Sequence, residues 1–218
     1  MRIVMIHAIG ESIRPVRMAF GDVFPEAEVI NLLDEALLVD FDDKLTPKLV
    51  RRMSTLVTYA ADHGADAIGL ACSVYAPAVE IIKDLVDVPL VSSYGPVMAD
   101  AVASGPRVGI IASVPATIRD AEHYLREEAK QQNREIEPHP RLAEDLIDVL
   151  RHQGDAAFEK RLAEEVNALA SQVDAVLLSQ FSMATALDHV KSQCPVPVLS
   201  PPHSSARRLK ELLSERRA

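Results

Sequence analysis

The sequence ADAIGLACSVYAP, residues 65–77, contains a short apolar run that is followed directly by a cysteine, Cys72. The run shows no alternation of polar and apolar residues, which is typical of a strand that is covered on both faces. A helical pattern of apolar residues begins after the cysteine. The stretch therefore predicts a buried parallel strand that leads into a helix, with a thiol where the two meet.

The same pattern occurs again 108 residues later, as VDAVLLSQFSMAT at residues 173–185. VPLVS at 88–92 aligns with VPVLS at 196–200 at the same offset, and RIVMIHAIGESIR at 2–14 aligns with RVGIIASVPATIR at 107–119 at an offset of 105. This internal repeat predicts two halves with the same β-α-β plan. It pairs Cys72 with Gln180 and His7 with Ala112.

Apolar runs alternate with amphipathic stretches along the whole chain, which indicates βαβ units and parallel sheets. Strands are expected at residues 2–7, 28–32, 66–71, 88–92, 107–112, 134–138, 174–179 and 196–200. Helices are expected at residues 12–21, 46–63, 74–86, 95–103, 116–132, 141–152, 155–172, 183–193 and 204–217. The predicted fold is α/β, with two pseudo-symmetric αβα lobes that each contain a parallel four-stranded sheet.

The repeat also predicts the domain boundaries. We expect an N-terminal lobe at residues 1–95 and a C-terminal lobe at 96–202, with the C-terminal helix at 203–218 packed on the first lobe. Ligands of open α/β sheets bind at the carboxyl ends of the strands. The expected active site is therefore a cleft between the lobes, with Cys72 and Gln180 on opposite sides.

Composition excludes several classes of protein. The 218 residues are 48% hydrophobic and 25% charged, with a net charge of -9, which argues against a nucleic-acid partner. No apolar stretch is long enough to span a membrane, and a strand-like run occupies the place of a signal peptide. The two cysteines form no metal-binding pattern, and glycine motifs for nucleotides are absent from the sequence. We expect a cytoplasmic protein with free thiols, no metal, no cofactor and no membrane association.

The two strand ends DAIGLACS and DAVLLSQ, together with the two-lobe plan, resemble the aspartate/glutamate racemase superfamily. This superfamily includes glutamate, aspartate and hydantoin racemases, maleate isomerases and arylmalonate decarboxylases, and the resemblance extends over nearly the whole chain. It implies a cofactor-independent enzyme in which a cysteine of each lobe exchanges a proton with the carbon next to a carboxylate. It also implies a small carboxylate substrate and a homo-oligomer.

The resemblance assigns roles to individual residues. Cys72 stands at the position of the first family cysteine and is implied to donate or accept the proton. Gln180 stands where the second cysteine is usual, and Cys194 lies too far along the following helix to replace it. The residues that are implied to hold the carboxylate and its enediolate are Ser73, Val74, Ser113, Thr117, Ser179 and Gln180.

The residues themselves leave alternatives open. A free cysteine is most often a buried core residue, whereas a helix N-terminus lowers the pKa of a thiol toward neutrality. Gln180 can bind a substrate or cap a helix, and Ser113 and Thr117 are ordinary helix-capping residues. His7 and His203, which follow strands, are candidates for a second catalytic acid or base, or are histidines with satisfied hydrogen bonds.

The predicted function is that of a racemase- or isomerase-type enzyme that transfers a proton at the carbon alpha to the carboxylate of a small acid or amino-acid derivative. Because the second cysteine is missing, two alternative functions remain open. One is a single-cysteine decarboxylase of a malonate-like acid, and the other is a non-catalytic protein of the same fold that binds small carboxylates. Turnover that depends on Cys72 separates the two enzymes from the binding protein.

Overall fold

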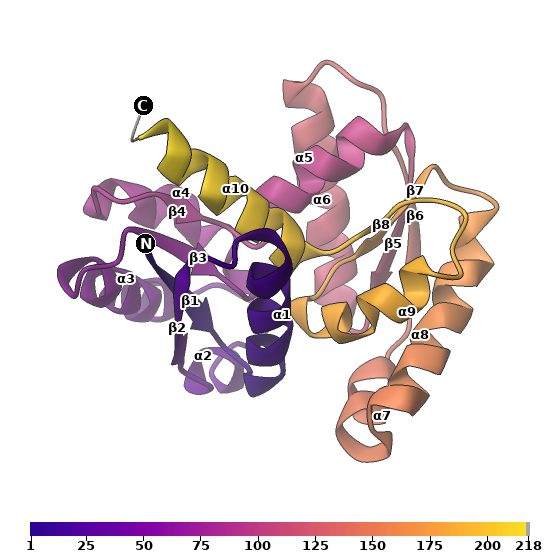
Figure 1. Cartoon of the computed structure of the whole chain (residues 1–218), viewed down its shortest axis with the longest axis horizontal. Helices are drawn as coiled ribbons and strands as arrows, with labels where there is room; N and C mark the ends of the chain where they lie inside the picture. Colours follow the sequence, from indigo (N-terminus) through magenta and orange to yellow (C-terminus); the bar gives the residue numbers. More distant parts are fainter. Residues whose placement is uncertain (217–218) are drawn as a thin grey trace. The chain divides into compact units, whose positions relative to one another are not determined.

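The computed structural model describes residues 1–216, which divide into two compact units (Figure 1). Unit 1 comprises residues 1–96 together with the described chain from residue 202 onward, and unit 2 comprises residues 97–201. Each unit contains a four-stranded sheet in which every neighbouring pair of strands is parallel. The α/β fold with two parallel four-stranded sheets, predicted from the sequence, is confirmed.

The sheet of unit 1 has the strand order β2-β1-β3-β4. Its strands are β1 (Arg2–His7), β2 (Glu28–Leu33), β3 (Ala67–Leu70) and β4 (Leu90–Val91). The helices and 3-10 turns of this unit are η1 (Gly10–Ser12), α1 (Ile13–Val23), α2 (Ala36–Val39), α3 (Pro47–Asp62), η2 (Ser73–Tyr75), α4 (Ala78–Ile82), η3 (Lys83–Leu85) and α10 (Pro201–Glu215), which begins at the unit boundary.

The sheet of unit 2 has the equivalent order β6-β5-β7-β8. Its strands are β5 (Arg107–Ala112), β6 (Glu137–Leu142), β7 (Ala175–Leu178) and β8 (Val198–Leu199). Its helices and 3-10 turns are α5 (Gly95–Ser104), which begins at the unit boundary, α6 (Pro115–Gln131), α7 (Leu146–Gln153), α8 (Asp155–Ala170), η4 (Phe181–Ala186) and α9 (Leu187–Lys191).

The internal repeat of the sequence reappears in the register of the central strands. Ile3 of β1 pairs with Ala67 of β3 in unit 1, and Val108 of β5 pairs with Ala175 of β7 in unit 2. These partners are separated by the same offsets as the sequence alignment. Equivalent residues therefore occupy equivalent places in the two sheets, which allows the residues after β3 and β7 to be compared one by one.

Helix α3 illustrates how the sequence builds the core of unit 1. Thr46 caps the helix by accepting a hydrogen bond from the Leu49 N–H, and proline occupies the first helical turn, where its missing N–H costs nothing. Leu49, Met53, Val57 and Ala60 recur at helical spacing and are buried against the sheet. The core of unit 2 is built in the same way from β5, β7 and helices α7 to α9.

The edge strand β6 was predicted in the wrong place. The expected strand at 134–138 lies instead at Glu137–Leu142, so Arg141, expected to begin a helix, belongs to the strand. Pro138 and Pro140 obscured the strand, because proline lacks the N–H of a sheet ladder. An edge strand tolerates both prolines, since one of its sides has no partner strand.

Two helix predictions also need correction, and one short helix was missed. The helix expected at 74–86 is divided into η2, α4 and η3, because Pro77 cannot continue the hydrogen-bond ladder of a helix. The helix expected at 183–193 begins as the 3-10 turn η4 and continues as α9. The four-residue helix α2 was not predicted, and the predicted helix end at residue 217 lies outside the described residues.

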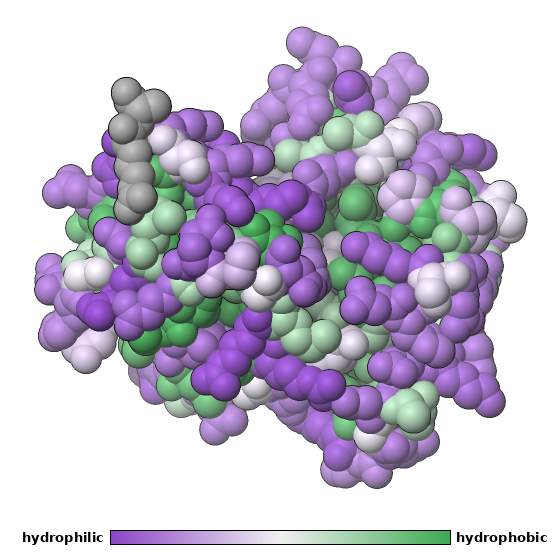
Figure 2. Space-filling model, in the orientation of Figure 1, coloured by the Kyte–Doolittle hydropathy of each residue, from purple (hydrophilic) through white to green (hydrophobic). Residues whose placement is uncertain are grey.

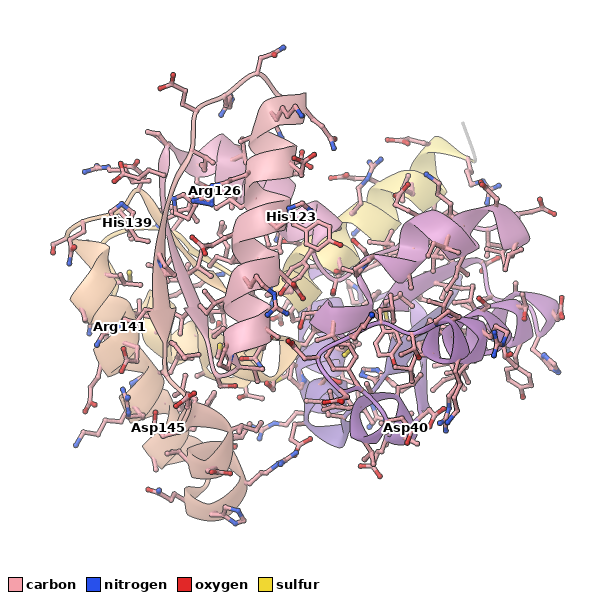
Figure 3. All side chains as sticks on the ribbon, turned by 180° about the vertical axis from the view of Figure 1, so that it is seen from behind. Asp40, His123, Arg126, His139, Arg141 and Asp145 are labelled. Atoms are coloured by element: carbon pink, nitrogen blue, oxygen red, sulfur yellow. The ribbon has the colours of Figure 1, made fainter. Side chains whose placement is uncertain are left out.

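Charged side chains surround the prolines of β6. Figure 3 shows His139 and Arg141 on this strand and Asp145 just before α7. Arg141 forms an ion pair with Glu165 of α8, and Arg161 of the same helix contacts Asp145 at 2.8 Å. Prolines and charges on an edge strand disfavour pairing with a further strand.

The surface is largely hydrophilic on the face in Figure 2, with patches of hydrophobic residues between the polar ones. Within the described residues, most exposed large hydrophobic side chains belong to unit 1: Ile30, Leu33, Leu38, Val39, Tyr59, Ile81 and Leu85. Among the described residues of unit 2, Val114 and Leu142 are the exposed large hydrophobic side chains. Among residues 1–216, the structure contains no helix with the length and apolar character needed to cross a membrane.

Candidate functional site

The first group of predicted site residues lies at the carboxyl end of β3, a central strand of unit 1. Cys72 has an extended backbone, with φ -135° and ψ 121°, and it precedes the short 3-10 turn η2. Its carbonyl oxygen accepts hydrogen bonds from the Tyr75 N–H at 3.2 Å and from Ser93 Oγ at 3.2 Å. Residues 71–75 are called the Cys72 turn below.

The thiol of Cys72 is half-buried and packs against the core of unit 1. Burial raises the pKa of this thiol to about 12, and the backbone N–H groups of Val74 and Tyr75 only partly oppose the rise. The sequence predicted that a helix N-terminus would lower this pKa, which is wrong. A three-residue turn, rather than an α-helix, follows Cys72, and loss of solvation outweighs its N–H groups. The thiol is therefore protonated at neutral pH.

Tyr75 fixes the shape of the Cys72 turn and was missing from the predicted site. Its ring is fully buried, and its hydroxyl donates a hydrogen bond to the Leu37 carbonyl oxygen at 2.7 Å. The ring also lies 6.4 Å from that of Phe41, measured between centroids. Burial and the neighbouring Cys72 raise the pKa of Tyr75. An aromatic residue three positions after Cys72, in a turn of small residues, was the available signal.

His7 ends β1, the strand beside β3. Its ring is completely buried, with Nδ1 at 2.6 Å from Ser12 Oγ and Nε2 at 2.9 Å from Asn31 Oδ1. Burial lowers the pKa of His7 to about 4, although the Asn31 hydrogen bond opposes this shift. The imidazole is therefore neutral at pH 7, and both nitrogens are engaged. This geometry favours a structural role, and the catalytic role of His7 stays a prediction.

His203 lies in the first turn of α10, in unit 1. Its Nε2 is 3.3 Å from the Asp22 carboxylate of α1, and its side chain is 12% exposed. The contact ties α10 to α1, and the role of His203 as a second acid or base stays a prediction.

The second group of predicted site residues lies at the carboxyl end of β7, in unit 2. Gln180 has an extended backbone, with φ -127° and ψ 141°, and its carbonyl oxygen accepts a hydrogen bond from the Met183 N–H at 3.1 Å. Residues 179–183 are called the Gln180 turn below. Ser113, which directly follows β5, donates from its N–H at 2.7 Å and from Oγ at 2.8 Å to Gln180 Oε1. The structure thus brings Ser113 and Gln180 together.

The two other hydroxyl residues predicted for unit 2 are buried. Thr117 lies in the first turn of α6, and its N–H donates to the Val114 carbonyl oxygen at 3.0 Å, as expected near a helix start. Ser179 is 1% exposed, and its hydroxyl has no hydrogen-bond partner among the described residues. A buried hydroxyl without a partner is unfavourable, which makes Ser179 an unusual feature of this turn.

Metal ligands are a separate question. Within residues 1–216, no group of three or more His, Cys, Asp or Glu side chains is arranged to hold a metal ion.

A cavity of about 210 Å³ in unit 1 lies between α3 and the edge of the sheet and involves none of the predicted site residues. Its lining consists of Arg2, Val4, Ile30, Leu32, Tyr59, Ala60 and His63.

Comparison with known proteins gives a clear result for the fold. No protein-family model matches the sequence, and a search of curated proteins found no match. Among solved structures, allantoin racemase from Klebsiella pneumoniae is similar with a TM-score of 0.78 and 17% identity, over 99% of this chain and 88% of that one. Glutamate racemase from Francisella tularensis subsp. tularensis SCHU S4 is similar with a TM-score of 0.74 and 16% identity, over 99% and 82%.

An aspartate racemase homologue from Pyrococcus horikoshii OT3 is similar with a TM-score of 0.71 and 16% identity, over 98% of this chain and 99% of that one. Identities this low establish the architecture and leave the chemistry to be argued from the residues. The structural resemblance predicted from the sequence is confirmed: the chain has the α/β fold of the aspartate, glutamate and allantoin racemases.

Proposed function

We propose that this protein is a cofactor-independent enzyme of the racemase or isomerase type, which transfers a proton at the carbon next to the carboxylate of a small acid or amino-acid derivative. The observation that carries the proposal is the thiol of Cys72 at the carboxyl end of a central parallel strand, where ligands of such sheets bind. The fold shared with several racemases supports it.

Cys72 serves as the proton donor in this proposal. Because burial keeps the sulfur protonated at neutral pH, the resting enzyme holds the proton that the carbanion needs. A base must first take a proton from the carbon, a role for which the sequence indicates His7 or His203, and the electron pair of that C–H bond stays in the enediolate. In the protonation step the S–H bond of Cys72 breaks, a new C–H bond forms, and a thiolate remains. The N–H groups of Val74 and Tyr75, which favour the charged form of the sulfur, stabilise that thiolate. The reverse step returns the proton to sulfur.

The carboxylate and its enediolate form need hydrogen-bond donors. We propose the groups that the sequence indicated for this role, which are small hydroxyl residues, one amide and backbone N–H groups. They are Ser73, Val74, Thr117, Ser179 and Gln180, and Ser113 supports this role through its two hydrogen bonds to Gln180 Oε1.

A second candidate function is decarboxylation of a malonate-like acid. The observation in its favour is Gln180, because an amide at the place equivalent to Cys72 cannot accept or donate a proton in the reaction. In a decarboxylation the C–C bond to one carboxylate breaks, CO2 leaves, and the electron pair stays on the remaining carbon. The Cys72 thiol then protonates that carbon on one face, and water reprotonates the sulfur.

The deciding experiment is NMR detection of deuterium uptake at Cα in D2O, with amino acids, hydantoins, hydroxy acids and malonates as substrates. We expect exchange or CO2 release with the wild type, and a rate about 1,000-fold lower with Cys72→Ala, within the range for loss of a catalytic acid or base. Cys194→Ala is the matched control and should retain the wild-type rate. Chirality lost during exchange indicates racemisation, and CO2 release from malonates indicates the second candidate.

Equal rates for the wild type and Cys72→Ala would contradict the thiol mechanism. Saturable binding of these acids, with neither exchange nor CO2 release, would identify a binding protein that has the fold without the chemistry.

A further inference from the structure

The hydrogen-bond donors of Ser113 determine the orientation of the Gln180 side-chain amide. A backbone N–H can only donate a hydrogen bond, so the Gln180 atom that faces the Ser113 N–H at 2.7 Å must be the carbonyl oxygen. The Ser113 hydroxyl donates to the same oxygen at 2.8 Å. The orientation of the amide is therefore fixed, and its NH2 group lies on the side away from these donors.

The NH2 group of Gln180 is available for a ligand. No hydrogen-bond partner of Nε2 is found among residues 1–216, and the Gln180 side chain is only partly buried. Ser113 is almost completely buried, so it holds the amide from the protein side. A donor that is oriented before a ligand arrives has little reorganisation to undergo on binding.

A second donor lies in the same turn. Ser179, one residue before Gln180, has a buried hydroxyl without a hydrogen-bond partner among the described residues. Both residues stand at the carboxyl end of β7, the edge of a parallel sheet at which ligands bind. Two neutral donors without acceptors suit an oxygen atom of a carboxylate or carbonyl group.

We propose that Gln180 is a specificity-determining residue of an oxyanion-binding subsite in unit 2, in which its Nε2 hydrogens, oriented by Ser113, bind one oxygen of a carboxylate or carbonyl substrate. Ser113 is a positioning residue that acts through the amide. The inference rests on the proposed function, because it names the group of the substrate that this turn recognises. It assigns to Gln180 a binding role in place of the proton transfer that a thiol would perform.

The test is a titration of 15N-labelled protein with acetate and malonate, followed by NMR at the Gln180 side-chain NH2 and the Ser113 amide. We expect saturable shifts of both signals with the wild type. Gln180→Ala should weaken binding about tenfold, and Gln180→Glu should weaken it further, because a carboxylate repels the ligand and offers no N–H. Ser113→Ala should weaken binding less, and Ser113→Thr, which keeps the hydroxyl, should restore it.

Gln172→Ala is the matched control, because Gln172 is an exposed glutamine that bonds only within its own helix end. Its affinity for both probes should equal that of the wild type. Unchanged affinity in Gln180→Ala would overturn the inference, and tighter binding would overturn it by showing that the amide competes with the ligand. Absence of saturable shifts in the wild type would also overturn it. Since the readout is binding, a failure to detect proton exchange leaves this result intact.

Discussion

The Cys72 turn and the Gln180 turn have nearly the same backbone and different chemistry. Both follow a central strand in extended conformation, and both close with an N–H three residues later that donates to the first carbonyl oxygen. The charged form of Cys72 is favoured by the backbone N–H groups of Val74 and Tyr75. Gln180 is instead held by hydrogen bonds from the N–H and the hydroxyl of Ser113. The fold determines where a functional group stands, and neighbouring side chains determine what it can do.

The surrounding positions differ in a complementary way. By the repeat, Ser113 of unit 2 corresponds to Ala8 of unit 1, and Ala112 corresponds to His7. Unit 1 therefore has its polar side chain, His7, one position earlier, at the last residue of the strand, where it forms hydrogen bonds with Ser12 and Asn31. Unit 2 has a hydroxyl one position later, where it reaches Gln180. A shift of one residue decides whether a polar group supports the core or the turn.

Reactivity of the thiol gives the largest expected effect. Because burial raises the pKa of Cys72 to about 12, little thiolate is present near neutrality. At about pH 8, iodoacetamide should modify Cys72 roughly 100-fold more slowly than a small thiol of ordinary pKa, after allowing for the greater nucleophilicity of a basic thiolate. Mass spectrometry of the peptide that contains Cys72 measures the rate, and Cys194→Ser removes interference from the other cysteine.

Modification of Cys72 at the rate of a free thiol would show that the Cys72 turn does not raise the pKa of the sulfur, because its N–H groups then offset the loss of solvation. The two turns would then differ in residue type alone, and Cys72 would serve as readily for proton abstraction as for donation.

Much of the fold was predictable because the repeat constrains it twice. The repeat gives the same four-strand plan in both halves, and its offsets match the register of the central strands. The edge strand β6 escaped prediction because Pro138 and Pro140 are typical of loops. Cys72 and Gln180 were found as equivalent residues for the same reason, since both end a central strand.

The electrostatics of the site could not be predicted, because they depend on residues far apart in the chain. Asn31 lies 24 residues from His7, and Gln180 lies 67 residues from Ser113. The sequence alone gives no measure of how strongly these groups are desolvated. The direction of the Cys72 pKa shift was therefore wrong, although the position of the thiol was identified.

Acid sensitivity is the second expected effect, and it should originate in unit 1. His7 has a pKa of about 4 in the folded protein and 6.5 as an ordinary histidine, so the unfolded chain binds more protons between these values. Its contribution to stability is complete above about pH 6.5 and is lost as the pH falls toward 4. Between about pH 7 and pH 5, the free energy of unfolding should fall by about 2 kcal/mol through His7.

Urea unfolding at several pH values measures this loss, which should be smaller in His7→Asn because asparagine does not titrate. His152→Asn, which replaces an exposed histidine, should keep the wild-type pH dependence. An identical slope in His7→Asn and the wild type would show that other groups carry the acid sensitivity. Loss of proton exchange in a stably folded His7→Asn would instead point to a catalytic histidine.

Transfer of a thiol to the Gln180 turn gives the smallest expected effect and the most direct test of the comparison. Gln180→Cys leaves the Ser113 N–H and hydroxyl without their acceptor, so both become free to donate to a thiolate at this position. We expect the introduced thiol to react with iodoacetamide about tenfold faster than Cys72. The gain should disappear when Ser113→Ala is added. If the two thiols react equally slowly, the shared backbone and its burial control the sulfur, and the side-chain difference between the turns concerns binding alone.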